Sequence, residues 1–549
     1  YQHFVPQFLL RNFSHPFVDE ESNESKVKKR RKKAKHPKAK PFPGDPVVHS
    51  AALSEDPIKL VETTVKRILG QMDMYRDTSQ PLLTQNHIED MFSQIESRVS
   101  TIFRKITKAF DAGDPGLWLT RKERNDVRKF LFLLKYRGSR FHRRFDHPTP
   151  EEYDENDKEL FQEYMSQKGF TRPISVWFDN LKSIMELEMD AAGEWMDKIR
   201  RKIYHSDAEW FITHTQSFYM AICTPEDPSD EFVITDRCNN VFEGRNRFAI
   251  DAGTGQVDPV TYISLHEFAP ISPKLMIVLR NLVFPLPDED ADPKTKEDRE
   301  DLRARAVDNI FGPETLENSL LFSLPIKKAR NSYSASVNGR LRLVGGEDGT
   351  HKLSHKFLFN FFRIEQTHVH KINGVFFDNA FTCTNIVFAS RDSFLRSLEW
   401  YMTAAPEVIG KRVALTDGGQ RLHYFQKLDV LMKALGSNKK SVWDETPLEG
   451  LYHREFHRFW MTYIARETQN VTNDPSLPLS RLLSTYLILG GSPIMFWDDL
   501  AQSRRMFILR VKIDSWSQGV DEDIRQRNRE LLTEGYLRSP PWRFWIYMK

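Results

Sequence analysis

The stretch Val127–Tyr136 places the strongest constraint on the fold, because its apolar residues lie on almost every side of a helix. A helix of this kind is stable only when other elements enclose it. Thr120 followed by Glu123 makes a capping box ahead of it, and Gly138 is a natural stop behind it. The sequence therefore predicts a buried helix with a defined start and end.

A long amphipathic helix is predicted before it. Asn86 followed by Glu89 predicts its N-cap and the capping-box partner. Apolar residues then recur every three or four positions, at Ile88, Phe92, Ile95, Val99, Ile102, Ile106 and Phe110. This period predicts one buried face, and Glu96 lies next to it. We expect helical structure from Pro57 onward for roughly 140 residues, with another helix opening at Thr149–Glu152.

The hydrophobic period then changes to that of β-strands. Strands are predicted for Trp210–Ile212, Phe218–Met220, Glu231–Thr235 and Pro273–Arg280. The last segment is apolar enough to be a central strand. The polar, Gly-rich stretch Asn331–His351 predicts a loop or a hairpin.

Helical spacing returns from Glu365 to Val387, and a further helix is expected from near Ser390 to near Tyr401. This order predicts an α+β fold with a mostly helical N-terminal part, a small central sheet and a helical C-terminal part. We expect one α+β domain over residues 1–401 of the 549-residue chain. Residues 402–549 are expected to form a mixed, Trp-rich extension that packs on it.

Charge is distributed unevenly along the chain. The net charge of +3 includes ten basic residues between Lys26 and Lys40, so the other residues carry about −7 together. We expect residues 19–46 to form a disordered insertion, because they lack apolar periodicity, and residues 288–300 to form an acidic linker. The six consecutive basic residues are Lys28, Lys29, Arg30, Arg31, Lys32 and Lys33. They fit a nuclear-localisation signal, a nucleic-acid contact or a solvated loop.

Several classes of protein and site are disfavoured by what the sequence lacks. The three cysteines have no CxxC spacing, which argues against a disulfide scaffold and fits an intracellular protein, cytoplasmic or nuclear. No run of eighteen apolar residues is present, so we expect no membrane span. We also expect no cofactor and no metal site, because His368 and His370 would point apart on a helix and the Gly-Gly pairs do not fit phosphate loops. The sequence does not indicate the oligomeric state.

The first thirteen residues are mainly apolar and aromatic, yet they contain His3 and Arg11. A buried Arg needs a carboxylate or carbonyl partner. One hypothesis docks this N-terminal segment on the helix that ends at Arg137 and on the strand end at Asp236, with His3 and Arg11 facing inward. The alternative is that Arg11 and Arg137 form buried structural salt bridges with Glu96 and Asp236.

The pattern His3-x-x-Pro6-x-Phe8-x-Leu10-Arg11-Asn12-Phe13 resembles the opening of the family catalogued as domain of unknown function number 4238. Further blocks follow in the family's order up to about Tyr401: Ile95-Glu96, Phe130–Arg140, Phe232–Asp236, Pro270–Pro273, Ile372-Asn373 and a helix over Asn379–Ser390. The length and style of the chain resemble those of fungal members.

A looser resemblance links the chain to fungal arginine-containing cyclodipeptide synthases, which take amino acids from charged tRNA and form a diketopiperazine. It implies an aminoacyl transferase whose tRNA contacts residues 26–40. His3, Asp236 and Glu96 are the candidate catalytic residues. The candidate substrate-binding residues are Arg11, Asn12, Arg137, Arg140, Glu243 and Asn385. The alternative is a non-enzymatic or defence-type nucleic-acid-binding protein that uses the same basic segment.

Overall fold

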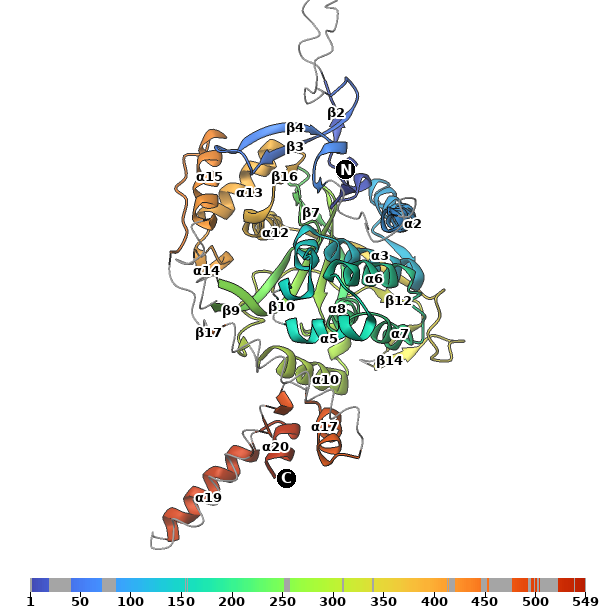
Figure 1. Cartoon of the computed structure of the whole chain (residues 1–549), viewed down its shortest axis with the longest axis vertical. Helices are drawn as coiled ribbons and strands as arrows, with labels where there is room; N and C mark the ends of the chain where they lie inside the picture. Colours follow the sequence, from blue (N-terminus) through green and yellow to red (C-terminus); the bar gives the residue numbers. More distant parts are fainter. Residues whose placement is uncertain are drawn as a thin grey trace, which may run out of the picture. The chain divides into compact units, whose positions relative to one another are not determined.

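The computed structural model of this chain is shown in Figure 1. It describes residues 2–18, 41–71, 85–153, 155, 157–250, 257–308, 311–337, 340–411, 413, 420–445, 452–453, 476–491, 495–497, 499–500, 503, 522–537 and 539–548. Contacts divide the chain into two compact units. Unit 1 comprises Tyr1–Lys296 and Leu316–Leu451, and unit 2 comprises Glu297–Thr315 and Tyr452–Lys549. Residues 402–451 therefore belong with the N-terminal part, beyond the boundary expected at residue 401.

A mixed sheet forms the centre of unit 1. Its strands run in the order β12-β15-β7-β11-β10-β9, and β6 also pairs with β15. Their bounds are β6 (Gly116–Thr120), β7 (Phe218–Pro225), β9 (Phe242–Ile250), β10 (Val257–Ser272), β11 (Leu275–Asn281), β12 (Arg330–Asn331) and β15 (Lys356–Ile364). All of these pairs are antiparallel except β15 with β7. Since β7 and β11 are buried along their whole length, the sheet is covered on both faces.

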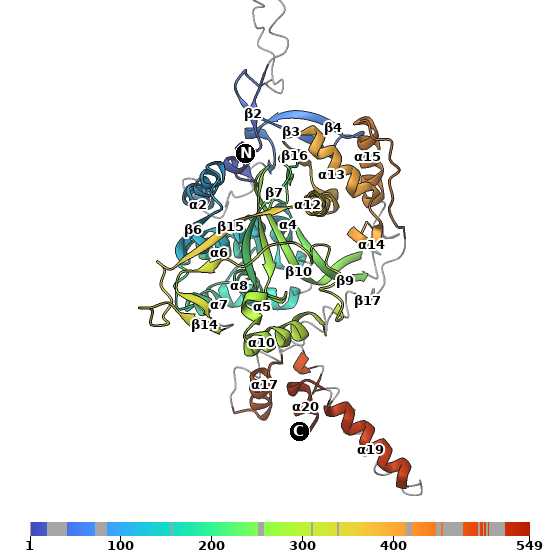
Figure 2. The same cartoon turned by 180° about the vertical axis from the view of Figure 1, so that it is seen from behind.

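The alternation of side chains along the strands builds two separate cores. Met220 and Ile277 point into the first core, whereas Ala221 and Val278 point into the second. Figures 1 and 2 show helices on both sides of this sheet. The first core is covered by α2 (His87–Asp111), α3 (Arg121–Tyr136), α4 (Ser139–Phe145), α5 (Lys158–Lys168), α6 (Pro173–Glu186), α7 (Trp195–Lys202) and α8 (His205–Gln216). The second is covered by α12 (Gln366–Asn379), α13 (Arg391–Thr403) and α15 (Gln420–Ala434).

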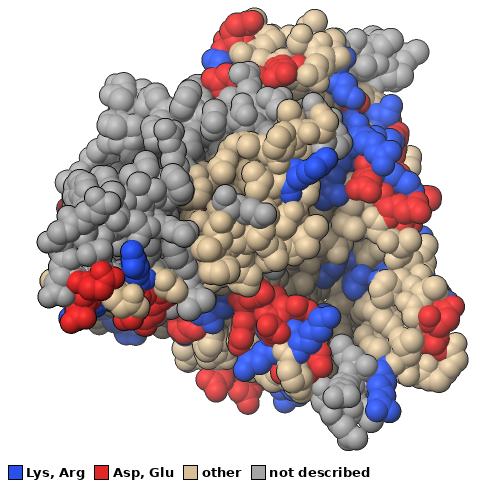
Figure 3. All heavy atoms as spheres, turned by 90° about the horizontal axis from the view of Figure 1, so that it is seen from below, with Lys and Arg blue, Asp and Glu red and all other residues tan. Residues whose placement is uncertain are grey.

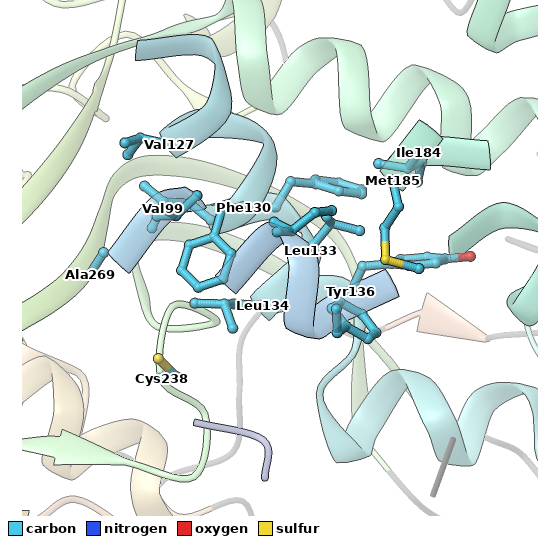
Figure 4. Close-up of a cluster of buried hydrophobic side chains, with 14 of the residues drawn as sticks. Val99, Val127, Phe130, Leu133, Leu134, Tyr136, Ile184, Met185, Cys238 and Ala269 are labelled. Atoms are coloured by element: carbon cyan, nitrogen blue, oxygen red, sulfur yellow. The ribbon is translucent and has the colours of Figure 1, made fainter. Parts of the chain in front are cut away.

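Helix α3 lies inside the first core. Figure 4 shows Val127, Phe130, Leu133 and Leu134 packed against side chains from α2, α6 and the sheet. The side chains of these four residues are all at most 2% exposed. The predicted buried helix is therefore confirmed.

A second sheet in unit 1 joins the N-terminal part to later segments. Its strands run in the order β2-β3-β16-β8, and β4 pairs with Val47–Ala52 of β3. The bounds are β2 (His15–Pro16), β3 (Pro46–Ala52), β4 (Lys59–Thr64), β8 (Ile234–Thr235) and β16 (Asn385–Phe388). The N-terminal segment itself forms β1 (Gln2–His3), which pairs with β5 (Gly70–Gln71), and α1 (Gln7–Arg11).

Shorter elements complete the two units. The other short elements are η2 (Val65–Arg67), η4 (Pro150–Glu152), α9 (Pro287–Asp290), α10 (Pro293–Arg303), η5 (Ala304–Asp308), β13 (Ser334–Val337), β14 (Arg340–Leu343), η6 (Ala380–Thr382) and α14 (Pro406–Ile409). Unit 2 also contains α17 (Pro478–Ile488), α19 (Glu522–Leu537) and α20 (Pro541–Met548). Tyr486, Phe496 and Trp542 are in its own small core. No helix among the described ranges is both long and apolar enough to cross a membrane.

The predicted α+β class is confirmed, although the sheet is larger than expected. The capping box at Thr120 and Glu123 is present, and the central strand at Pro273–Arg280 is β11. Helix α2 begins after Asn86 as predicted, but the Asn86 side chain makes no cap hydrogen bond. The stretch Asn331–His351 contains the hairpin of β13 and β14.

Other local predictions are wrong because tertiary pairing overrides a short pattern. Trp210–Ile212 belongs to α8, where Phe211 and Ile212 share a buried helical face. Helix α12 ends at Asn379, and Asn385–Phe388 is a strand held between β3 and β8 rather than part of a helix over Asn379–Ser390.

Three boundaries also differ from the predictions. The helical region does not begin at Pro57, because β4 follows there. The expected acidic linker, residues 288–300, is helical in α9 and α10. Thr149–Glu152 opens only a single 3-10 turn. Of the expected insertion, residues 41–45 precede β3, which begins at Pro46, and residues 19–40 lie outside the described residues.

The capping box should contribute measurably to the stability of unit 1. We expect Thr120→Ala to lower the free energy of unfolding by about 1 kcal/mol, because the Glu123 amide loses its acceptor, Thr120 Oγ1, at 3.1 Å. Thr101→Ala makes the same change on an exposed position of α2 and should alter stability by less than about 0.5 kcal/mol. Urea unfolding of both variants measures the difference, and equal effects would contradict the prediction.

Candidate functional site

The N-terminal segment docks on the end of α3. Arg137, the C-cap residue of α3, is buried and donates from Nη1 to Glu96 Oε1 at 2.8 Å and from Nη2 to the Phe4 carbonyl at 3.4 Å. Its guanidinium also lies 4.7 Å from the centre of the Phe92 ring. The Arg137–Glu96 pair matches one part of the alternative that the sequence left open, in which Arg11 and Arg137 pair with Glu96 and Asp236.

His3 lies beside this ion pair. Its Nδ1 is 3.0 Å from the Ile68 carbonyl, and its ring is about half-buried. Burial lowers the pKa of His3, and nearby Arg137 lowers it further. The imidazole is therefore neutral at neutral pH, and its Nδ1–H holds β1 against the turn at Ile68.

Arg11 was expected to face inward, and this expectation is wrong. Helix α1 turns Leu9 and Leu10 into the core, which leaves Arg11 exposed on the opposite side. Asn12 is also exposed, but its Nδ2 donates to the Ile271 carbonyl at 2.8 Å. Asn12 therefore fastens the N-terminal segment to the end of β10.

Asp236 is bonded to a different part of unit 1. Its carboxylate accepts from Thr384 Oγ1 at 2.6 Å and from the amides of Thr384 and Asn385 at 2.9 and 3.0 Å. Burial raises the pKa of Asp236, although these hydrogen bonds oppose the rise. The Asn385 side chain donates to Thr384 Oγ1. Asp236 and Asn385 thus join β8 to β16. None of these hydrogen bonds involves the N-terminal segment.

Glu243 has a similar structural role on β9. It lies 2.8 Å from Nδ1 of the buried His266 and accepts from Ser319 Oγ and the Leu320 amide, both at 3.1 Å. Burial lowers the pKa of His266. Glu243 therefore anchors the 319–320 loop to the sheet.

A buried ionic group absent from the predicted site lies between α3, α8 and β10. Lys135 Nζ is 2.6 Å from Glu267 Oε1, and His214 Nδ1 is 3.1 Å from Glu267 Oε2. Burial alone would raise the pKa of Glu267, but Lys135 and His214 together lower it to about 2. The carboxylate is therefore ionised at neutral pH.

The remaining predicted contacts cannot be placed. The side chain of Arg140 lies outside the described part of the chain, and so do the basic residues 28–33. Figure 3 shows a face on which the described acidic and basic side chains are interspersed. That face carries no continuous basic surface among the described residues. Among the residues that the structure describes, the predicted site residues thus belong to several separate groups of contacts.

A cavity of about 400 Å³ lies instead among α2, α3 and the end of α6. Buried Asn125, Lys129 and Met185 line it, together with the exposed or half-exposed charges of Arg98, Lys122, Asp126, Glu186, Glu188 and Asp190. Its volume suits a ligand of one or two amino acids. The mixture of carboxylates and cations suits a ligand that itself carries both charges.

Lys129 is the chemically distinctive residue of this cavity. Its Nζ donates to the carbonyls of Met185 at 3.2 Å and Leu187 at 2.8 Å, at the C-terminal end of α6. Burial lowers the pKa of Lys129 to about 8. A lysine with this pKa is neutral in part near pH 8, so it can accept a proton. The only sequence signal is that Lys129 lies within the mainly apolar stretch Val127–Tyr136, a signal that Arg128 and Lys135 share.

Side chains of the kinds that bind metal ions lie close together in the second sheet of unit 1. His368 and His370 do not share a group, because His368 Nε2 lies 3.2 Å from Ser323 Oγ and His370 packs near the Trp400 ring. His15, His49 and Glu62 bring one ligand atom each within 4.8 Å of one another. No sequence spacing pointed to this group.

The Glu267 ion group predicts a pH-dependent stability. Glu267→Gln should lower the free energy of unfolding at pH 7 by about 3 kcal/mol, because the buried Lys135 amine loses its carboxylate partner. Glu267 has a lower pKa in the folded chain, about 2, than its ordinary 4.5. Its contribution is therefore complete above pH 4.5 and is lost as the pH falls toward 2. The difference between wild type and variant should shrink over that window in chemical unfolding.

Glu209→Gln provides the control for this measurement. Glu209 pairs with Arg200 at the surface, where each side chain is 39% exposed. That substitution should cost less than about 1 kcal/mol at pH 7. A Glu267→Gln variant no less stable than this control would contradict the buried ion group.

Comparison with known proteins gives one match. The model of the family described as "Protein of unknown function (DUF4238)" matches residues 1–393. No curated protein and no solved structure matches the chain. The matched residues include β1, α1, Glu96, Arg137 and Asp236, and they make up more than half of the sequence. The chain therefore belongs to the DUF4238 family.

Proposed function

We propose that this protein is an aminoacyl transferase that takes amino acids from charged tRNA and forms a cyclic dipeptide containing arginine. The observation that carries the proposal is the 400 Å³ cavity with Lys129 in its lining and a pKa of about 8. The looser resemblance of the chain to the arginine-containing cyclodipeptide synthases supplies the reaction class.

The carboxylates of the cavity support arginine as one substrate. A guanidinium forms paired, charge-assisted hydrogen bonds with a carboxylate. Asp126 and Glu188 line the same cavity as Lys129, on α3 and just after α6. A guanidinium bound by them would place the remainder of the substrate beside Lys129.

The reaction needs a proton acceptor and no redox partner. The α-amine of one aminoacyl-tRNA attacks the ester carbonyl carbon of the other, so a C–N bond forms and the ester C–O bond breaks. The amine proton passes to neutral Lys129 and then to the leaving oxygen of tRNA. A second, intramolecular attack of the same kind closes the ring. Two tRNAs with free hydroxyls and one diketopiperazine result.

The basic residues 26–40 would hold the tRNA in this scheme. They supply ten cations for phosphate contacts within fifteen positions. We expect tRNA binding to weaken steeply with rising salt, and deletion of residues 26–40 to reduce both affinity and this salt dependence. Filter binding at several salt concentrations measures both. Unchanged binding by the deletion variant would remove the segment from the proposal.

Lys129→Arg tests the proposed proton acceptor. Arginine retains the charge and donates to the same carbonyls, but it cannot lose its proton at neutral pH. Product formation from arginyl-tRNA and a second aminoacyl-tRNA should fall by at least about 100-fold. The exposed Lys182 on α6 offers a matched control, and Lys182→Arg should retain full activity. Mass spectrometry of the cyclic dipeptide and acid-gel analysis of tRNA deacylation provide the two readouts.

Absence of both product and deacylation with the wild-type protein would overturn the enzymatic proposal. Salt-dependent tRNA binding without turnover would favour the alternative, a non-enzymatic or defence-type nucleic-acid-binding protein. Full activity of Lys129→Arg would contradict the role of Lys129 as proton acceptor and of this cavity as the active site.

A further inference from the structure

Three side chains that can act as metal ligands lie close together on one face of the second sheet of unit 1. Strand β3 pairs with β4 so that His49 stands directly opposite Glu62. It also pairs with β2, where His15 stands opposite Val47. Val47 and His49 are two residues apart, so they point to the same face. Pleating therefore brings His15, His49 and Glu62 together, each from a different strand.

The spacing of the ligand atoms fits one shared ion. His15 Nε2 lies 3.4 Å from Glu62 Oε1, and His49 Nδ1 lies 3.6 Å from the same oxygen. Both distances are longer than an ordinary hydrogen bond to nitrogen. Ligands about 2.1 Å from a tetrahedral Zn²⁺ are about 3.4 Å apart, whereas neighbouring ligands of an octahedral ion of the same radius are only about 3.0 Å apart. The two distances to Glu62 Oε1 are closer to the tetrahedral case.

The contacts of His15 leave its Nε2 available to bind a metal ion. Its Nδ1 lies 3.3 Å from the Pro16 carbonyl, which fixes the proton on that nitrogen. Nε2 is then a lone-pair donor, and it is buried without a hydrogen-bond partner in the described part of the chain. The His15 and His49 rings lie 4.3 Å apart, and the Phe388 ring stacks on His49 at 5.9 Å. The aromatic neighbour holds the His49 ring in place.

We propose that His15, His49 and Glu62 bind one Zn²⁺ ion, with water or a substrate oxygen as its fourth ligand. Two imidazoles and one carboxylate are a common three-ligand set for Zn²⁺, and such sites keep one position open. The three side chains are between 35% and 37% exposed, so solvent reaches the open position. The proposal is independent of the aminoacyl-transfer chemistry, because none of these residues lines the Lys129 cavity.

The ion would also close a loop of the chain. His15 precedes residues 19–40 and His49 follows them, and β2 contributes only two residues to the sheet. A shared metal bond would secure this short strand. If Zn²⁺ binds the folded chain and not the unfolded chain, it would raise the melting temperature.

The test uses the full-length protein after removal of metal with a chelator. Titration with Zn²⁺ against a competing indicator should give one tight site per chain. Glu62→Gln and His49→Gln should each weaken that site by at least about 100-fold, because each removes one of three protein ligands. Co²⁺ in place of Zn²⁺ should give the intense visible absorption of four-coordinate cobalt, and Glu62→Gln should abolish it.

His423→Gln is the matched control. His423 pairs with Asp56 at 3.1 Å as an exposed histidine–carboxylate pair that is not part of the three-ligand group. This variant should bind Zn²⁺ like the wild type and show the same rise in melting temperature. Glu62→Gln retains the backbone pairing of β4, and circular dichroism checks its fold. Absence of tight Zn²⁺ binding in the wild type, or equal binding by Glu62→Gln, His49→Gln and His423→Gln, would overturn the proposal.

Discussion

The buried cations of helix α3 need hydrogen-bond acceptors, and the first core of unit 1 is arranged around this requirement. Helix α3 is enclosed by α2, α6, α8 and the sheet, yet it and its C-cap carry cations that cannot remain buried alone. Arg128 donates to the carbonyls of Thr215 and Phe218, Lys129 to those at the end of α6, Lys135 to Glu267, and Arg137 to Glu96 and Phe4. Each cation thus ties α3 to a different neighbour. Apolar packing stabilises the helix, and these polar ties determine which elements surround it.

The same constraint distinguishes structural from chemical cations on α3. Lys135 and Arg137 lie against the carboxylates of Glu267 and Glu96, which makes them parts of structural ion pairs. Lys129 contacts two neutral carbonyls, and burial lowers its pKa to about 8. In the proposed reaction, the cavity that Lys129 lines is where α3 accepts a proton. The same amine can bind the carbonyls at the end of α6 and accept a proton from a substrate. Neutral Lys129 donates to the two carbonyls through its N–H groups, and this leaves its lone pair available.

Long-range strand pairing sets the second proposed site. Strand β3 lies between β4 and β16, and its partner β2 comes from before residues 19–40. Strand β16 comes from more than 300 positions later and contributes Phe388 against His49. Asp236 secures the start of β16 through three hydrogen bonds. A residue expected to act in catalysis thereby supports the sheet on which His15, His49 and Glu62 meet.

The sequence by itself determined the elements whose signals are local. The capping box at Thr120, the enclosed helix α3 and the buried strand β11 follow from spacing and composition within a few residues. The pairing of Arg137 with Glu96 was part of one of the alternatives that the sequence left open, because a buried guanidinium requires a partner such as a carboxylate. Only the tertiary structure decided that Trp210–Ile212 is helical, that Asn385–Phe388 is a strand and that Arg11 faces solvent. It alone also placed Lys129 in a cavity and joined His15, His49 and Glu62. These outcomes depend on partners distant in sequence, and no local pattern contains the energy of such contacts.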